Sequence, residues 1–182
     1  MITIEPSLAW GLRIAMVVLI GLALLHKLRA PLEFRSAMQA YLRNTVLDKE
    51  SIVSFLSLTV ITLELAITFL VAVAWWPLVG AVALATLFLI YGVAMAANLL
   101  RGNALLDCGC SWGADRQPAT WYRVWGNAGL SALSLLLAVP VVERPANNID
   151  LFVAGAFAGF VIILYAISNQ LMANSGRLEQ KL

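Results

Sequence analysis

Long apolar stretches separated by short polar segments run through this chain. Residues 65–100 contain no charged side chain, and as one helix they would measure about 54 Å against roughly 30 Å of bilayer hydrocarbon. The stretch must therefore fold in two, and Trp75-Trp76-Pro77 marks the turn, because tryptophan prefers the interface and proline readily begins a helix. The pattern predicts five membrane spans: residues 8–25, 52–76, 78–100, 122–142 and 149–172.

Composition agrees with an all-α, polytopic membrane bundle that forms a single integral domain over residues 1–182. Apolar residues make up 62% of the chain and charged residues 12%. The first span is expected to be retained, because residues 1–6 lack the basic region of a cleavable signal. The longest polar segments, 26–51 and 101–121, leave no room for a soluble catalytic domain. A net charge of +2 without a basic soluble surface argues against nucleic-acid binding.

The polar segment after the first span contains a second, shorter periodicity. Residues 32–43 place apolar and polar side chains on opposite sides of a helix, which predicts a short amphipathic surface helix. In a five-span protein the segments 26–51 and 101–121 emerge on the same side. The surface helix is therefore expected either to roof the bundle beside residues 101–121 or to rest on lipid headgroups as a simple connector.

Small residues suggest where helices touch. Gly155 and Gly159 form a Gly-x-x-x-Gly motif in the last span, and Gly126 and Gly129 lie in the fourth. Such spacing favours close contact between helix backbones. We expect packing contacts at these glycines.

Reactive chemistry is concentrated at Cys108 and Cys110, the only two cysteines, in the segment between the third and fourth spans. A disulfide in so small a ring would be strained and oxidising, and Gly109 gives the backbone the freedom the ring needs. The pair is interpreted as a redox switch, with an idle or structural pair as the alternative. Asp107 disfavours the thiolate by like-charge repulsion, whereas Arg101 would favour it if it folds over the segment. No metal site is expected, because two thiols and a single histidine fall short of the four ligands of structural zinc.

Aromatic residues crowd the same region. Trp112, Trp121 and Trp125 are either interfacial anchors or the wall of a pocket for a flat quinone. No flavin or haem motif is present, so a thiol oxidase in the bilayer would pass its electrons to a membrane quinone. Quinone is therefore the expected cofactor.

An acidic residue, Glu64, lies in the middle of the second span. An ionisable group is costly there and usually faces a partner or a cavity. Asn98, Asn127 and Arg13 are candidate partners, and either proton handling or a structural hydrogen bond would explain the residue.

Charge and chemistry make opposite predictions about sidedness. Ten of the twelve basic residues are assigned to the side of segments 26–51 and 101–121, which the positive-inside rule places in the cytoplasm. A reducing compartment disfavours a disulfide. A thiol oxidase would instead need the cysteines on the oxidising side, with basic residues held at anionic headgroups.

Taken together, these residues resemble the MauE family of methylamine-utilisation membrane proteins, within a wider DoxX-like group. The resemblance covers nearly the whole chain and rests on these elements: His26-Lys27, the surface helix, Glu64, Arg101-Gly102, Asp107-Cys108-Gly109-Cys110 and Trp112-Gly113.

The resemblance implies a role in maturing methylamine dehydrogenase, whose small subunit contains many disulfides. The expected partner is a membrane-tethered, thioredoxin-like protein of the MauD type, and the expected location is the bacterial inner membrane with the cysteines on the periplasmic face. The plan also resembles vitamin K epoxide reductase, although those enzymes use Cys-x-x-Cys. Cys108 and Cys110 would take electrons from the partner's dithiol and pass them to quinone. A non-catalytic scaffold or export helper is the rival interpretation, and a transporter a weaker one.

Overall fold

A computed structural model of the chain describes residues 3–43, 48–102, 120–145 and 147–179. The described chain is helical, without a β-strand, which confirms the predicted all-α bundle. Its elements are α1 (Pro6–Arg29), α2 (Pro31–Leu42), α3 (Glu50–Val73), α4 (Pro77–Leu100), α5 (Trp121–Leu135), the 3-10 helix η1 (Leu136–Ala138) and α6 (Asn148–Glu179). Four described segments are long and apolar enough to cross a membrane: Pro6–Arg29, Glu50–Val73, Pro77–Leu100 and Asn148–Leu171.

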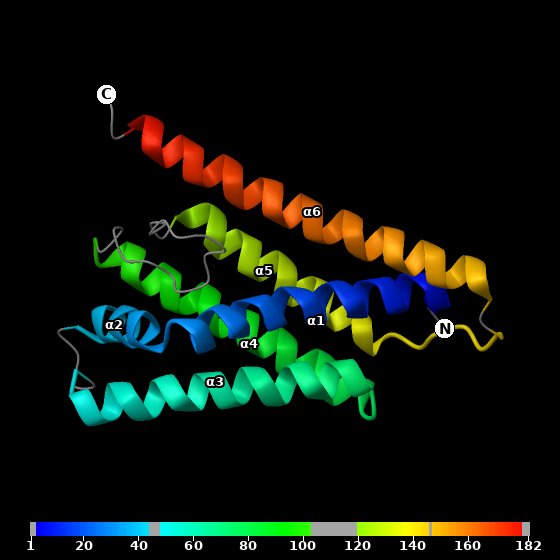
Figure 1. Cartoon of the computed structure of the whole chain (residues 1–182), viewed down its shortest axis with the longest axis horizontal. Coiled ribbons are helices and arrows are strands. Elements are labelled where there is room, and N and C mark those ends of the chain that lie inside the picture. The colour runs from blue at the N-terminus through cyan, green and yellow to red at the C-terminus, as the bar shows by residue number, and fades with distance from the viewer. Residues whose placement is uncertain (1–2, 44–47, 103–119, 146, 180–182) are drawn as a thin grey trace.

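The long helices lie side by side, with α1 between α6 and α3 (Figure 1). Helix α4 packs along α5 and η1. The core forms where α1 and α4 meet, around Met16 and Leu84, both with no exposed surface. Because most of the remaining apolar side chains face outward, lipid is the environment that this surface requires.

The predicted turn between the second and third spans is confirmed. Helix α3 ends at Val73, Ala74 adopts a left-handed conformation with φ of 55°, and Pro77 begins α4. Trp75 and Trp76 remain exposed at the tip of the turn. Their position fits the preference of tryptophan for the membrane interface.

Helix α5 is shorter than the predicted span 122–142. Regular α-helix ends at Leu135, and one 3-10 turn carries the chain to Ala138. The reason is Pro140, since the residue before a proline avoids helical angles and Val139 is extended, with ψ of 134°. The apolar stretch of the sequence continues past this point, but the helix ends.

An ionic network holds together the end of the bundle where α1 and α6 begin. Arg144 bonds to Asp150 at 2.6 Å and to Glu5 at 3.0 Å, and so links the start of α6 to the chain before α1. These hydrogen bonds, first to Asp150 and then to Glu5, raise the pKa of Arg144 above its usual value. An isolated bridge between Ile4 and Val141 closes the same end.

The end of the bundle away from this network is the α2 end. It contains α2, the C-terminal ends of α1 and α4, and the N-terminal ends of α3 and α5 (Figure 1). The surface helix predicted at residues 32–43 is confirmed as α2 (Pro31–Leu42). It packs against α3 and α1, and Arg35 pairs with Glu50 at 3.0 Å. Residues flanking the undescribed segment 103–119 belong to this same end, as predicted.

The predicted glycine contacts are wrong. A Cβ on Gly155 or Gly159 would meet no atom within 4 Å, and the same holds for Gly126 and Gly129. The close approach lies at Gly11 of α1, where a Cβ would meet the carbonyl oxygen of Ala154 at 2.8 Å. A motif cannot show which side of its helix faces a neighbour.

Gly11→Ala is therefore expected to destabilise the bundle by about 1–3 kcal/mol, because the new methyl group strikes the backbone of α6. Gly155→Ala, on an open face, is expected to be neutral or slightly stabilising, since alanine favours helix. Thermal unfolding in detergent, followed by circular dichroism, measures both. Equal effects of the two substitutions would contradict this assignment of the α1–α6 contact.

Candidate functional site

The predicted redox residues Cys108 and Cys110, with Asp107 and Trp112, lie outside the described residues. Their positions along the chain are nonetheless bracketed. Helix α4 ends at Leu100 and α5 begins at Trp121, both at the α2 end of the bundle (Figure 1). Arg101, next to α4, is exposed. The cysteine segment therefore joins the bundle at the α2 end.

A buried ionic cluster lies inside the bundle. Lys27 of α1 donates a hydrogen bond to Oε1 of Glu64 of α3, and Tyr91 of α4 donates its hydroxyl to the same oxygen. Lys27 and Glu64 are 1% and 0% exposed. The predicted partners of Glu64 were wrong: Asn98 donates to Ala94, Asn127 donates to Arg123, and Arg13 belongs to a separate pocket.

Aromatic rings enclose the ammonium group of this cluster. Nζ of Lys27 lies 4.9 Å from the ring centroid of Tyr91 and 5.2 Å from that of Phe34. Phe34 is the buried residue of α2. Phe34 therefore places α2 over the cluster. Because a ring face attracts a cation, this contact also stabilises the cluster.

Local sequence explains why these three side chains converge. Lys27 continues the buried face of α1 formed by Met16, Ile20 and Leu24. Glu64 lies on the buried face of α3, which also includes Ser57 and Val71. Tyr91 follows Leu84 and Phe88 at helical spacing on α4. The pairing of Lys27 with Glu64 was missed because Lys27 was assigned to the polar loop, although helical spacing would have placed it on the inward face.

The second oxygen of the Glu64 carboxylate has no partner among the described residues. Oε2 is buried and accepts no hydrogen bond there. An unsatisfied buried polar atom costs about 1–3 kcal/mol, more when the group is charged. Such an atom in a native fold calls for a ligand, an ion or water.

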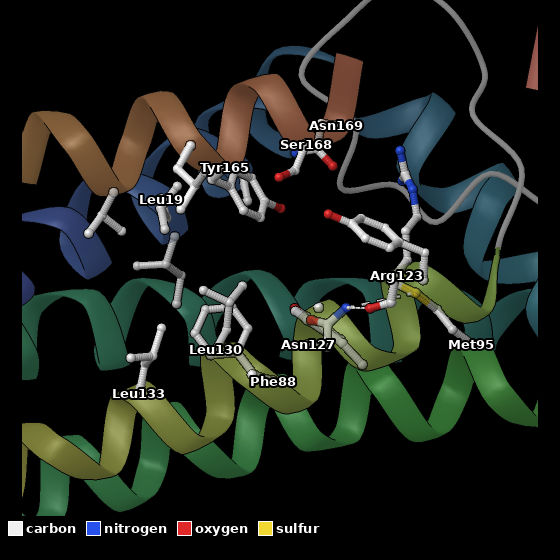
Figure 2. A pocket seen from close by; sticks show the side chains of 18 of the residues that line it. Leu19, Phe88, Met95, Arg123, Asn127, Leu130, Leu133, Tyr165, Ser168 and Asn169 are labelled. Carbon is white, nitrogen blue, oxygen red and sulfur yellow. Dashed lines mark hydrogen bonds between the residues drawn. The ribbon is translucent and has the colours of Figure 1, made fainter. Parts of the chain in front are cut away.

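Glu64 borders a cleft with a volume of about 260 Å³. Figure 2 shows side chains of α6 and α5 facing each other across it, with Tyr165, Ser168 and Asn169 opposite Arg123 and Asn127. The part of the cleft farther from the α2 end is apolar. Its lining there includes Leu19, Leu130, Leu133, Val161 and Leu164. A cleft with one polar and one apolar end suits an amphipathic molecule.

Two of the three tryptophans predicted to wall a quinone pocket, Trp121 and Trp125, face outward, and Trp112 is outside the described residues. Trp121 is 50% exposed and Trp125 is 72% exposed. Neither lines the cleft, whereas Tyr122, Arg123 and Gly126 of the same helix do. The outward rings are placed as interfacial anchors would be, and their contact with quinone stays a prediction.

The structure also changes which basic residues count as loop charges on the side of the cysteine segment. Lys27 is not a loop residue: it lies within α1, and Glu64 neutralises it. Arg123 is buried in α5. Two of the basic residues counted for that side therefore lie within helices of the bundle and not in the connecting segments. Within the described ranges, no group of three or more His, Cys, Asp or Glu side chains is placed to hold a metal ion.

These features define a multi-pass helical membrane protein with a buried ion pair beside an amphipathic cleft. The family profile described as "Methylamine utilisation protein MauE" matches residues 5–140. The chain belongs to the MauE family of methylamine-utilisation proteins.

Curated relatives support this assignment along most of the chain. The methylamine utilization protein MauE of Paracoccus denitrificans is 32% identical over 93% of this chain and 89% of its own length. Its counterpart from Paracoccus versutus is 31% identical over 92% of this chain and 88% of its own length. That of Methylorubrum extorquens is 32% identical over 88% of this chain and 84% of its own length. No solved structure matches the chain.

Proposed function

We propose that this protein is a membrane thiol-disulfide oxidoreductase that supports disulfide formation in the small subunit of methylamine dehydrogenase. Its electron donor is a membrane-tethered, thioredoxin-like protein of the MauD type, and its acceptor is a quinone of the bacterial inner membrane. The cysteine segment faces the periplasm. Family membership carries the link to methylamine utilisation.

The reaction balances as two linked exchanges. A thiolate of the partner attacks the Cys108–Cys110 disulfide and forms a mixed disulfide, which the partner's second thiolate then resolves. The partner is left oxidised, and Cys108 and Cys110 are left as thiols. These thiols then lose two electrons and two protons as their disulfide reforms, and the quinone gains both to become hydroquinone.

One observation supports this function above the others: the polar end of the cleft lies at the start of α5, where the described chain resumes after residue 119. Tyr122 and Arg123, at the start of α5, line its polar end, and residue 119 is the last of the segment before the described chain resumes at Thr120. An amphipathic electron acceptor in this cleft would lie next to the point where the cysteine segment rejoins the bundle. No soluble domain would be required.

A non-catalytic scaffold for the same maturation pathway is the second candidate. The observation that favours it is the open face of α6, where a Cβ added to Gly155 or Gly159 would meet nothing within 4 Å in the described part of the chain. Small residues on an unpacked helix face can accept a partner's transmembrane helix. In that case helix association, and not thiol chemistry, would be required for maturation.

Thiol labelling in intact cells tests the proposed sidedness and redox state together. We expect a membrane-impermeant maleimide to label the protein only after reduction, because Cys108 and Cys110 are joined and face outward. The double Cys108→Ser/Cys110→Ser variant sets the background, since the chain has 2 cysteines. Labelling that requires permeabilised cells would contradict the proposal.

A further inference from the structure

The unpaired Oε2 of Glu64 indicates what kind of ligand group would bind in the cleft. Oε2 is buried without a hydrogen-bond partner in the described structure, and Glu64 lines the cleft. A carboxylate oxygen can only accept, so the missing group must be a donor. Lys27 already balances the charge of Glu64. A neutral donor therefore fits better than a second cation.

The walls of the cleft have room for a flat ring. Gly126 and Gly129 line the α5 side, and a Cβ on either would meet nothing within 4 Å. Phe88 and Tyr91 line the α4 side. A volume of about 260 Å³ is slightly smaller than pockets for drug-sized ligands, which begin near roughly 300 Å³. It suits a single aromatic head group with an apolar tail leading out past the leucines.

We propose that this cleft binds the ring of a membrane hydroquinone, with a ring hydroxyl donating a hydrogen bond to Oε2 of Glu64. The proposal rests on the proposed function, in which quinone accepts the electrons, and it assigns that acceptor a site away from the outward rings of Trp121 and Trp125. Tyr91 and Lys27 act as positioning residues, because both hold the carboxylate through Oε1.

The chemistry of the contact favours one redox state of the ligand. The hydroquinone hydroxyl donates to the carboxylate, whereas the carbonyl of the oxidised quinone can only accept and is repelled by it. The cleft therefore binds the reduced form more tightly than the oxidised form. By linkage, a bound quinone is more readily reduced, which promotes electron flow from the thiols to the ring.

The test is a titration of the protein in nanodiscs with decylubiquinol and decylubiquinone by isothermal calorimetry. Wild-type protein is expected to bind the reduced probe at least about tenfold more tightly, because a hydrogen bond to a charged group contributes roughly 1.5–3 kcal/mol. Lys27→Met/Glu64→Gln removes both charges together, and the preference for the reduced probe should fall to about one.

Gly126→Leu supplies a second variant that leaves the ion pair intact. Gly126 lines the cleft and a Cβ there meets nothing within 4 Å, so the added bulk should weaken binding of both probes at least about tenfold. Gly155→Leu is the matched control, since it adds the same bulk on an open face of α6 and should bind normally. Circular dichroism checks that each variant is folded.

Three results would overturn the proposal. Unchanged binding by Gly126→Leu, or loss of binding in Trp125→Ala instead, would place the ring outside the cleft. A retained preference for the reduced probe in Lys27→Met/Glu64→Gln would remove Glu64 from the contact. Because these titrations involve no thiol chemistry, their failure leaves the role of Cys108 and Cys110 standing, and failure of the cysteine tests leaves the binding result standing.

Discussion

Glu64→Ala is expected to destabilise the bundle by about 3–5 kcal/mol, because it leaves the ammonium group of Lys27 buried and unpaired. That group is 1% exposed, and its other close oxygen, the Tyr91 hydroxyl at 3.2 Å, carries no full charge. The effect is large because the helices cannot open to solvate the charge without separating α1 from α3. Thermal unfolding in detergent micelles measures the loss.

Two further variants test whether the loss of stability comes from the unpaired buried charge. Lys27→Met combined with Glu64→Leu should recover most of the stability, since a buried ion pair can be replaced by apolar side chains at little cost. Arg35→Ala removes the exposed pair with Glu50 and should change stability by no more than about 1 kcal/mol. If Glu64→Ala alone were as mild as Arg35→Ala, the buried pair would not hold the bundle together.

Cys108→Ser and Cys110→Ser are each expected to abolish growth on methylamine. A single remaining thiol cannot form the Cys108–Cys110 disulfide, so the partner's thiolate has no disulfide to attack and no electron pair can be passed on. The methylamine dehydrogenase small subunit should then accumulate with free thiols. Alkylation of cell extracts followed by mass spectrometry counts those thiols directly.

The scaffold alternative predicts the reverse pattern. Under it, both serine variants mature the dehydrogenase normally, whereas Gly155→Leu blocks maturation by filling the open face of α6. Immunoblotting of the membrane fraction confirms that each variant reaches wild-type levels. Normal disulfides in both serine variants would remove thiol exchange from the mechanism.

Hydropathy predicted most of the helices because lipid solvation acts on each segment separately. The expected spans 52–76 and 78–100 correspond to Glu50–Val73 and Pro77–Leu100. Amphipathic spacing likewise located α2 to within one residue at each end. The error at 122–142 came from reading hydropathy through Pro140, whose effect is a backbone restriction and not a matter of polarity.

The candidate site was only partly accessible to the same reasoning. Glu64 stood out because a carboxylate inside a span requires an explanation. Lys27 did not, because it was counted among the charges of the polar segment that follows the first span. Its pairing depends on the rotation of α1 and α3 about their axes, which brings two residues 37 positions apart together.

Sequence by itself therefore determined that the chain is a helical membrane bundle with an amphipathic helix after the first span and a lone cysteine pair between the third and fourth. These properties depend on local composition and spacing. Only the tertiary structure decided that Gly11, and not Gly155, meets a neighbouring backbone, and that Lys27 and Tyr91 hold Glu64 beside a cleft. Those outcomes depend on how each helix is rotated and packed against its neighbours. Contacts between residues that are distant in the chain determine that arrangement.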